Sequence, residues 1–179
     1  MKYYIDCGSH NGTTVKFFRE VHDKDCEYHI YSFEPLPVFA ECLNGVEKNT
    51  FYNKAVWIYD GEIDFYLSRI EIRDGSTVIK EKTTGRLDYK NPIKIKCIDF
   101  SKWIERTFSK DDYIVLKMNI EGAEYEILKK MVKDGTIDYI DKLFIDWHWD
   151  RIGLSKSEHT GLINQIKIPI KGLEEFKDE

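Results

Sequence analysis

Two acidic residues and two glycines near the N-terminus have the spacing of a nucleoside-binding site. Asp6 ends an apolar segment, Gly8 and Gly12 follow it, and Glu34 ends the next apolar segment. Glycines let the backbone approach a ligand closely, and a carboxylate at a strand end can accept hydrogen bonds from both hydroxyls of a ribose. We therefore predict that the nucleoside part of a cofactor binds between Gly8 and Glu34.

The glycine spacing argues against a dinucleotide. A pyrophosphate-binding turn has the pattern Gly-x-Gly-x-x-Gly, and His10 stands where its second glycine would be. The pattern present, Asp6-x-Gly8-x-x-x-Gly12, resembles motif I of S-adenosylmethionine-dependent methyltransferases, whose ligand has no phosphate. Both glycines could also simply end a strand and start a helix, but the acidic strand end at Glu34 favours the cofactor.

Composition fits a small enzyme. The chain has 179 residues, which is the size of one domain, and 27 basic against 32 acidic residues give a net charge of -5. No basic cluster suits a nucleic-acid backbone, and no apolar run is long enough to span a membrane. The N-terminus enters a strand directly, without a signal region, so we expect a cytoplasmic protein. The four cysteines form no C-x-x-C pair, and we assign them no chemistry.

The hydrophobic periodicity alternates between strand and helix along the chain. This order predicts an α/β fold with a mostly parallel twisted sheet, flanking helices and a β-rich insertion in the middle. Leu173–Glu179 is charged enough that we expect it to fray. The predicted strands are 2–6, 28–34, Thr50–Ile58, Glu62–Leu67, Ile93–Cys97, Tyr113–Met118, Ile140–Trp147 and Lys167–Ile170, and the predicted helices are 12–22, 37–44, Asp99–Thr107, Gly122–Lys133 and Ser155–Asn164.

Several motifs together resemble the FkbM family of S-adenosylmethionine-dependent O-methyltransferases, over most of the chain up to about Asp150. They are motif I, Ser32-Phe33-Glu34-Pro35, Asn53-Lys54-Ala55-Val56, Asp74-Gly75-Ser76, Ile95-Lys96-Cys97-Ile98-Asp99-Phe100 and the stretch from Tyr113 to Glu124. The resemblance implies a single Rossmann-like methyltransferase domain over 1–179, and methyl transfer to a hydroxyl, commonly of a sugar or a glycosylated compound.

The resemblance also implies a set of cofactor-binding residues. Asn53 and Ala55 would border the adenine, although Ser76 belongs to a stretch that could be only a turn. The full expected set is Asp6, Gly8, Ser9, His10, Asn11, Gly12, Glu34, Asn53, Ala55 and Ser76.

The family pattern Lys-x-Asp-x-Glu-Gly is altered here, because Asn119 replaces the aspartate. An amide carries no negative charge, so it is a poor base and a weak ligand for a hard divalent cation. We expect no metal site. Three interpretations stay open: a metal-free enzyme with another base, metal ligands placed elsewhere, or a protein that binds the cofactor without turnover.

His148 is the candidate base. Strand alternation would place Asp146 and His148 on one side, and an imidazole titrates near neutral pH. A hydrogen-bonded structural histidine is the alternative. Lys117 is expected to support the acceptor, and Asn119 to orient a hydroxyl. Glu121 completes the candidate set, although a carboxylate at a helix N-terminus can also be only a cap.

These observations predict an O-methyltransferase that uses S-adenosylmethionine and a sugar or glycan acceptor. A catalytically inactive cofactor-binding module and a methyltransferase of other small molecules are the alternatives. A nucleotide-sugar oxidoreductase is a weaker alternative, because the dinucleotide motif fails. The sequence predicts neither the acceptor hydroxyl nor the oligomeric state.

Overall fold

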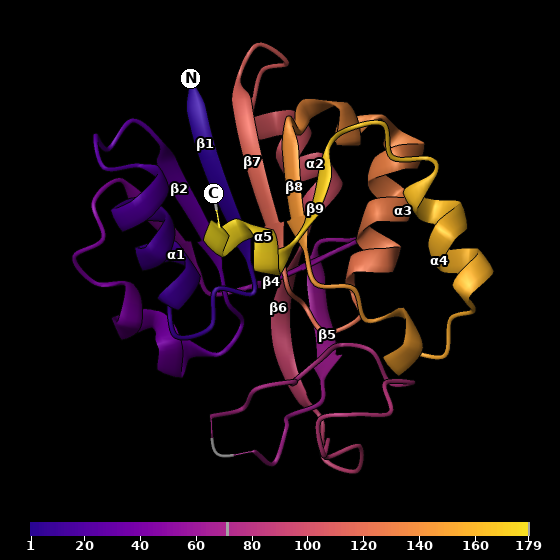
Figure 1. Ribbon diagram of the computed structural model, residues 1–179. Coiled ribbons are helices and arrows are strands. Elements are labelled where there is room, and N and C mark those ends of the chain that lie inside the picture. The colour runs from indigo at the N-terminus through magenta and orange to yellow at the C-terminus, as the bar shows by residue number, and fades with distance from the viewer. Residues whose placement is uncertain (71, 179) are drawn as a thin grey trace.

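A six-stranded sheet forms the centre of the protein (Figure 1). The computed structural model describes residues 1–70 and 72–178. The strand order is β3-β2-β1-β7-β8-β9, and all neighbouring pairs are parallel, which confirms the predicted Rossmann-like α/β fold. The strands of this main sheet are β1 (Lys2–Cys7), β2 (His29–Phe33), β3 (Asn49–Tyr52), β7 (Tyr113–Met118), β8 (Lys142–Ile145) and β9 (Ile170–Gly172).

Alternating side chains of β1 divide the core into two layers. Ile5 and Cys7 point to one face of the sheet, where they join the larger apolar cluster. Tyr4 points to the other face, where it packs with Val15 and Phe18. Both layers are buried because a parallel sheet is covered on both faces, as the continuous apolar runs of its strands require.

The helices cover these two faces. α2 (Phe100–Thr107) and α3 (Glu124–Asp134) pack on the larger cluster, whereas α1 (Thr13–Phe17) and α5 (Leu173–Asp178) cover the opposite face (Figure 1). The other helical segments are η1 (Phe18–His22, a π-helical continuation of α1), η2 (Pro37–Leu43), η3 (Thr136–Tyr139), η4 (Trp149–Arg151) and α4 (Lys156–Ile163). None of the helices in the described ranges is both long and apolar enough to traverse a lipid bilayer.

The β-rich middle forms a second sheet instead of extending the first. It has the order β4-β6-β5, with β4 (Ala55–Trp57) parallel and β5 (Gly61–Phe65) antiparallel to β6 (Ile93–Asp99). The predicted continuous strand Thr50–Ile58 is therefore wrong. The chain leaves the main sheet at Asn53, whose side chain donates to the carbonyl oxygens of Glu34 and Pro35, both at 2.9 Å.

The C-terminal segment also differs from expectation. The last strand begins at Ile170, at the end of the predicted strand, and the tail predicted to fray forms α5 up to Asp178. Phe176 is 2% exposed, and its ring stacks with Tyr4 and Phe18. Burial of this one aromatic ring stabilises the segment as a helix although most of its residues are charged. Glu179 lies outside the described residues.

The strand order reverses between β1 and β7. From β1 the chain proceeds to β2 and β3 on one side, and from β7 to β8 and β9 on the other. The loops that follow β1 and β7 therefore diverge, and ligands of open parallel sheets bind in the crevice at such a point. The segments Gly8–Gly12, Glu34–Leu36 and Asn119–Gly122 all follow strands at this edge.

Candidate functional site

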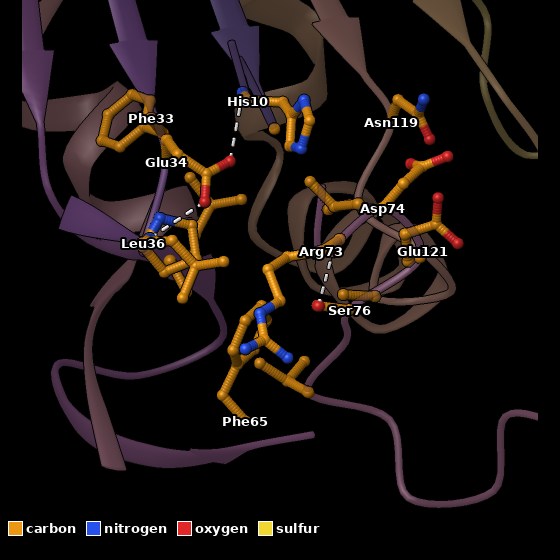
Figure 2. A pocket seen from close by; sticks show the side chains of 18 residues that line it. His10, Phe33, Glu34, Leu36, Phe65, Arg73, Asp74, Ser76, Asn119 and Glu121 are labelled. Carbon is orange, nitrogen blue, oxygen red and sulfur yellow. Dashed lines mark hydrogen bonds between the residues drawn. The ribbon is translucent and has the colours of Figure 1, made fainter. Parts of the chain in front are cut away.

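A cavity occupies the edge of the main sheet where β1, β2 and β7 end. It has a volume of about 690 Å³, part of which is open to solvent. Figure 2 shows Glu34 and Asn119 on opposite sides of it, with His10 above and Arg73 below. Phe33, Leu36, Val56, Phe65, Val78, Ile120 and Ala123 supply much of the apolar lining. A mostly apolar cavity with a few polar groups suits a small-molecule ligand.

Glu34 is held with its carboxylate at the cavity. Its Oε2 accepts the backbone N–H of His10 at 3.1 Å, and its Oε1 accepts that of Leu36 at 2.9 Å. The residue is 6% exposed, and this burial raises the pKa of the carboxyl even though the two N–H groups oppose the effect. Each oxygen retains acceptor capacity, so the group can still bind two hydroxyls.

Gly8 permits the loops after β1 and β7 to touch. Its φ is +81°, and a Cβ at this position would lie 2.1 Å from the carbonyl oxygen of Asn119. Its N–H donates to the carbonyl of Phe33 at 3.0 Å, which joins the turn to β2. The first glycine of the motif is therefore required by a backbone approach between protein segments, as well as by its conformation.

Asp6 and Lys117 form a buried ion pair behind this turn. Lys117 Nζ donates to Asp6 Oδ1 at 2.8 Å and to the Gly8 carbonyl at 2.9 Å, and the hydroxyl of Thr14 donates to Asp6 Oδ2 at 2.5 Å. Both charged residues are at most 2% exposed, and neither lines the cavity. We propose that Lys117 positions the Gly8 turn, in place of the direct contact with an acceptor expected from the sequence.

The other predicted cofactor residues fall into two groups. His10, Ala55 and Ser76 line the cavity together with Gly8 and Glu34. Ser9, Asn11, Gly12 and Asn53 lie outside the lining and support it. Ser9 is bonded to the Phe33 carbonyl, Asn11 accepts hydrogen bonds from Thr13, Gly12 begins α1 with a φ of +76°, and Asn53 braces the turn after Glu34.

Asn119 lines the cavity and carries an acceptor that is not used. Its Oδ1 is buried and has no hydrogen-bond partner among the described residues. A buried amide oxygen without a partner is costly, so a ligand with an N–H or O–H donor would be stabilised there. With the Glu34 carboxylate opposite, the cavity offers acceptors for ribose hydroxyls and for an ammonium group, which fits S-adenosylmethionine. No cluster of three or more His, Cys, Asp or Glu side chains within residues 1–70 and 72–178 has a metal-binding arrangement.

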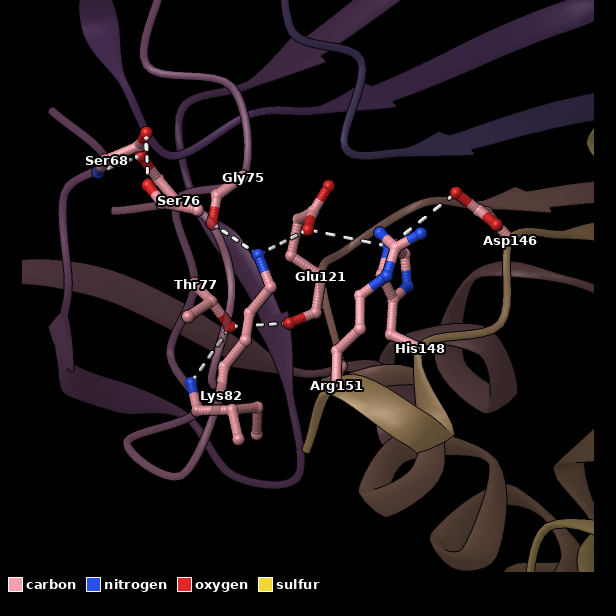
Figure 3. Close-up of polar contacts among 12 residues, drawn as sticks. Ser68, Gly75, Ser76, Thr77, Lys82, Glu121, Asp146, His148 and Arg151 are labelled. Carbon is pink, nitrogen blue, oxygen red and sulfur yellow. Dashed lines mark hydrogen bonds and ion pairs between the residues drawn. The ribbon is translucent and has the colours of Figure 1, made fainter. Parts of the chain in front are cut away.

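His148 lies beside this cavity, in a cluster of carboxylates. Its Nδ1 is 2.5 Å from Glu124 Oε1. Figure 3 shows its contacts with the other two carboxylates: Nε2 is 3.5 Å from Glu121 Oε2 and 3.6 Å from Asp146 Oδ2. Burial lowers the pKa of His148, but the hydrogen bond to Glu124 and the three negative charges outweigh it, so the pKa is raised above its usual 6.5. Since Nδ1 faces Glu124, Nε2 is the nitrogen available to take a proton.

Asp146 and His148 lie close together as the sequence predicted, but the strand alternation on which that prediction rested is wrong. β8 ends at Ile145, so strand alternation does not orient them; the irregular segment 146–148 before η4 does. His148 is completely buried and absent from the cavity lining, whereas Glu121 lines the cavity. A hydroxyl in the cavity therefore meets the Glu121 carboxylate before it meets the imidazole.

Three further residues belong to the site. Glu124 is fully buried, and its carboxylate is bonded to His148 and to the N–H of Gly122. Arg73 lines the cavity from the insertion between β5 and β6. Lys82 pairs with Glu121 at 2.6 Å. The spacing of Glu121 and Glu124 across the start of a helix could have indicated that Glu124 belongs to the site. No sequence motif marks Lys82.

The sequence matches the family model of the Methyltransferase FkbM domain over residues 6–166, which is most of the chain. The match confirms the family resemblance found in the motifs. No curated protein and no solved structure matches the chain significantly.

Proposed function

We propose that this chain, which belongs to the FkbM methyltransferase family, transfers the methyl group of S-adenosylmethionine to a hydroxyl of a sugar or glycan. The observation that carries the cofactor assignment is the cavity at the strand-order reversal, with the Glu34 carboxylate on one side and the unpartnered Asn119 Oδ1 on the other. Glu34 would hold the ribose, the apolar residues beside Ala55 the adenine, and Asn119 the amino group. The bound cofactor would supply an electrophilic methyl group.

The residues around His148 would prepare the acceptor. Glu121 and Asp146 offer carboxylate oxygens to a hydroxyl, and both lie within 3.6 Å of His148 Nε2. As the acceptor oxygen would replace the sulfur on the methyl carbon, its proton would pass first to Glu121, which lines the cavity, and from there to Nε2 of the buried imidazole. Glu124 holds the other ring nitrogen and stabilises the imidazolium that results.

A sugar acceptor is supported by the polar and aromatic groups on this side. Carboxylates at Glu121 and Asp146 suit the hydroxyls of a sugar, and Trp147 and Trp149 both pack against His159 nearby. A non-sugar alcohol and a cofactor-binding protein without turnover are the alternatives. We also propose a cytoplasmic location, consistent with four free cysteines.

Calorimetry followed by mass spectrometry tests this function. We expect S-adenosylmethionine and S-adenosylhomocysteine to bind with one site per chain, and NAD to show no binding because the pyrophosphate turn is missing. Incubation with S-adenosylmethionine and a panel of monosaccharides and oligosaccharides should add one methyl group to a hydroxyl. Binding without any methylated product would favour the inactive module, and failure to bind either sulfur compound would contradict the cofactor assignment.

A further inference from the structure

Lys82 is a buried cation in an otherwise irregular segment. The described residues between β5 and β6, 66–70 and 72–92, contain two isolated β-bridges, Tyr66 with Thr77 and Ser68 with Leu87. Lys82 is 2% exposed. A lysine is rarely buried to this degree unless its charge is paired, so the segment places it there at a cost that its partners must offset.

The segment is folded around this ammonium group. Lys82 Nζ donates to the Gly75 carbonyl at 2.7 Å (Figure 3), and Tyr89 OH donates to the Lys82 carbonyl. A Cβ at Gly75 would lie 3.3 Å from Nζ and one at Gly85 would lie 3.2 Å from it, and both residues have positive φ. The two glycines therefore leave the space that the ammonium occupies.

The partner of this ammonium is Glu121. Lys82 Nζ lies 2.6 Å from Glu121 Oε2, the oxygen that is also 3.5 Å from His148 Nε2. Glu121 has a φ of +59°, which is uncommon for a residue with a side chain, and its carbonyl accepts the Thr77 hydroxyl at 2.8 Å. The same segment therefore holds both the backbone and the carboxylate of Glu121.

We propose that Lys82 is a positioning residue for methyl transfer, and that its ammonium fixes the Glu121 carboxylate between the cavity and Nε2 of His148. The expected effect on turnover rests on the proposed function. The expected effect of Lys82 on the position of Glu121 and on His148 does not. Lys82 acts through Glu121, because the groups that face the imidazole are Glu121, Glu124 of α3 and Asp146. Arg151 of η4 is joined to His148 through the backbone, because its N–H donates to the His148 carbonyl.

The effect on His148 has a definite direction. Without the ammonium, the partly buried Glu121 carboxylate loses its counter-charge and turns away toward solvent. His148 then loses one of the three carboxylates that favour its protonated form, so its titration midpoint should fall by about one pH unit. Glu121→Gln removes the same charge and should lower the midpoint by a similar amount.

NMR titration of the histidines in the cofactor-free protein tests this. His148 is assigned by its loss in His148→Gln, and Lys80→Met is the control because Lys80 is exposed on the same segment. We expect Lys82→Met and Glu121→Gln each to lower the titration midpoint of His148, and Lys80→Met to leave it unchanged. The double variant Lys82→Met with Glu121→Gln should lower the midpoint no further than the larger of the two single effects. A folded Lys82→Met protein with an unchanged or raised midpoint, or additive effects, would overturn the proposal.

Turnover and hydrogen exchange complete the test. Lys82→Met should reduce kcat by up to about 100-fold, because a displaced Glu121 no longer lies between the acceptor and His148. Cofactor affinity should stay within about twofold, because neither Lys82 nor Glu121 is assigned a contact with the cofactor. If Lys82→Met does not fold, Glu121→Gln should still speed amide exchange at Thr77, Ile79 and Lys82, and unchanged exchange would overturn the proposal. A wild-type protein without turnover would contradict the proposed function, and the titration would still decide the role of Lys82.

Discussion

The two sides of the cavity are built in different ways. On the cofactor side, backbone groups do most of the work: two N–H groups orient Glu34, and Gly8 lets two loops approach within contact distance. On the acceptor side, charged side chains from separate segments position one another, as Lys82, Glu121, Glu124 and His148 do. The groups that border the cavity on the first side depend mainly on main-chain geometry, with one buried ion pair behind them, and those on the second side depend on charge compensation.

This difference predicts how each side fails. Loss of a single charge on the acceptor side leaves a buried partner uncompensated, and buried charges are costly when unpaired. On the cofactor side, the loops at Gly8 and Glu34 should be sensitive to changes of backbone shape, because their hydrogen bonds come from the main chain. The Asp6–Lys117 pair behind the Gly8 turn is the part of this side that should share the sensitivity to loss of charge. The predictions below address this contrast.

The largest expected effect is at His148. His148→Ala should reduce methyl transfer by about 10²- to 10⁴-fold, the usual contribution of a general base, while cofactor affinity stays nearly unchanged. His159→Ala is the matched control, because that histidine is partly buried against Tyr125 and packs on Trp149, outside the carboxylate cluster. Turnover, cofactor calorimetry and melting temperature measured on both variants check this. A folded His148→Ala protein that methylates at nearly the wild-type rate would exclude the imidazole as base.

Because the pKa of His148 is raised, the rate of methyl transfer and the stability of the protein should depend on pH in opposite directions. Because the base must be unprotonated, the rate should rise with pH to a plateau, with a midpoint above 6.5. A pKa that is higher in the folded than in the unfolded state stabilises the protein at low pH, and this contribution is lost as pH rises through the folded value. His148→Gln should remove both trends, which rate profiles and urea unfolding across pH can measure.

A backbone change at Gly8 should have the next largest effect. Gly8→Ala adds the cost of a left-handed residue, about 1–2 kcal/mol, to that of a clash with the Asn119 carbonyl, about 1–3 kcal/mol. Gly45 has the same φ of +81°, and nothing lies within 4 Å of a Cβ added there. Gly45→Ala should therefore lower the free energy of unfolding only by the cost of the left-handed conformation. Urea unfolding of both variants separates strain from contact. Equal losses would show that the approach between the two loops is not what requires glycine.

Glu34→Ala should weaken cofactor binding. Loss of the charged hydrogen bonds to the ribose is expected to cost about 1.5–3 kcal/mol, or roughly tenfold to a hundredfold in affinity. Glu41→Ala, an exposed carboxylate in the adjacent η2, is the control for net charge. Wild-type affinity should also weaken in acid, at a pH above the ordinary carboxyl range, because burial raises the pKa of Glu34. Calorimetry that finds unchanged affinity in a folded Glu34→Ala protein would remove the basis for the ribose assignment.

The smallest effect is expected from chelation. Because Asn119 supplies an amide where the family motif has a carboxylate, methyl transfer should survive exhaustive treatment with a chelator. Asn119→Asp restores the carboxylate and should create or strengthen a dependence on divalent ions. Activity assays with chelator, magnesium and manganese check both statements. Activity that disappears in chelator and returns with either ion would show that metal ligands lie elsewhere in the chain.

The sequence by itself determined the fold class and the edge of the sheet at which the cavity lies. Strand periodicity and short local motifs were sufficient because β1, β2 and β7 are continuous apolar runs, and the residues that end them must meet at one edge of a parallel sheet. The tertiary structure decided how those residues are used. Asp6 and Lys117 became a buried pair behind the turn, and the continuous strand expected at Thr50–Ile58 was divided between two sheets.

The acceptor side was decided by tertiary structure almost entirely. Lys82 reaches Glu121 across 39 positions of the chain from an irregular segment, and no periodicity or motif marks such a contact. Phe176 anchors a tail whose charges predict fraying, because the space beside Tyr4 is filled by one aromatic ring. Local patterns specify backbone conformation over a few residues, whereas pairing of buried charges and filling of a core depend on which distant segments the fold brings together.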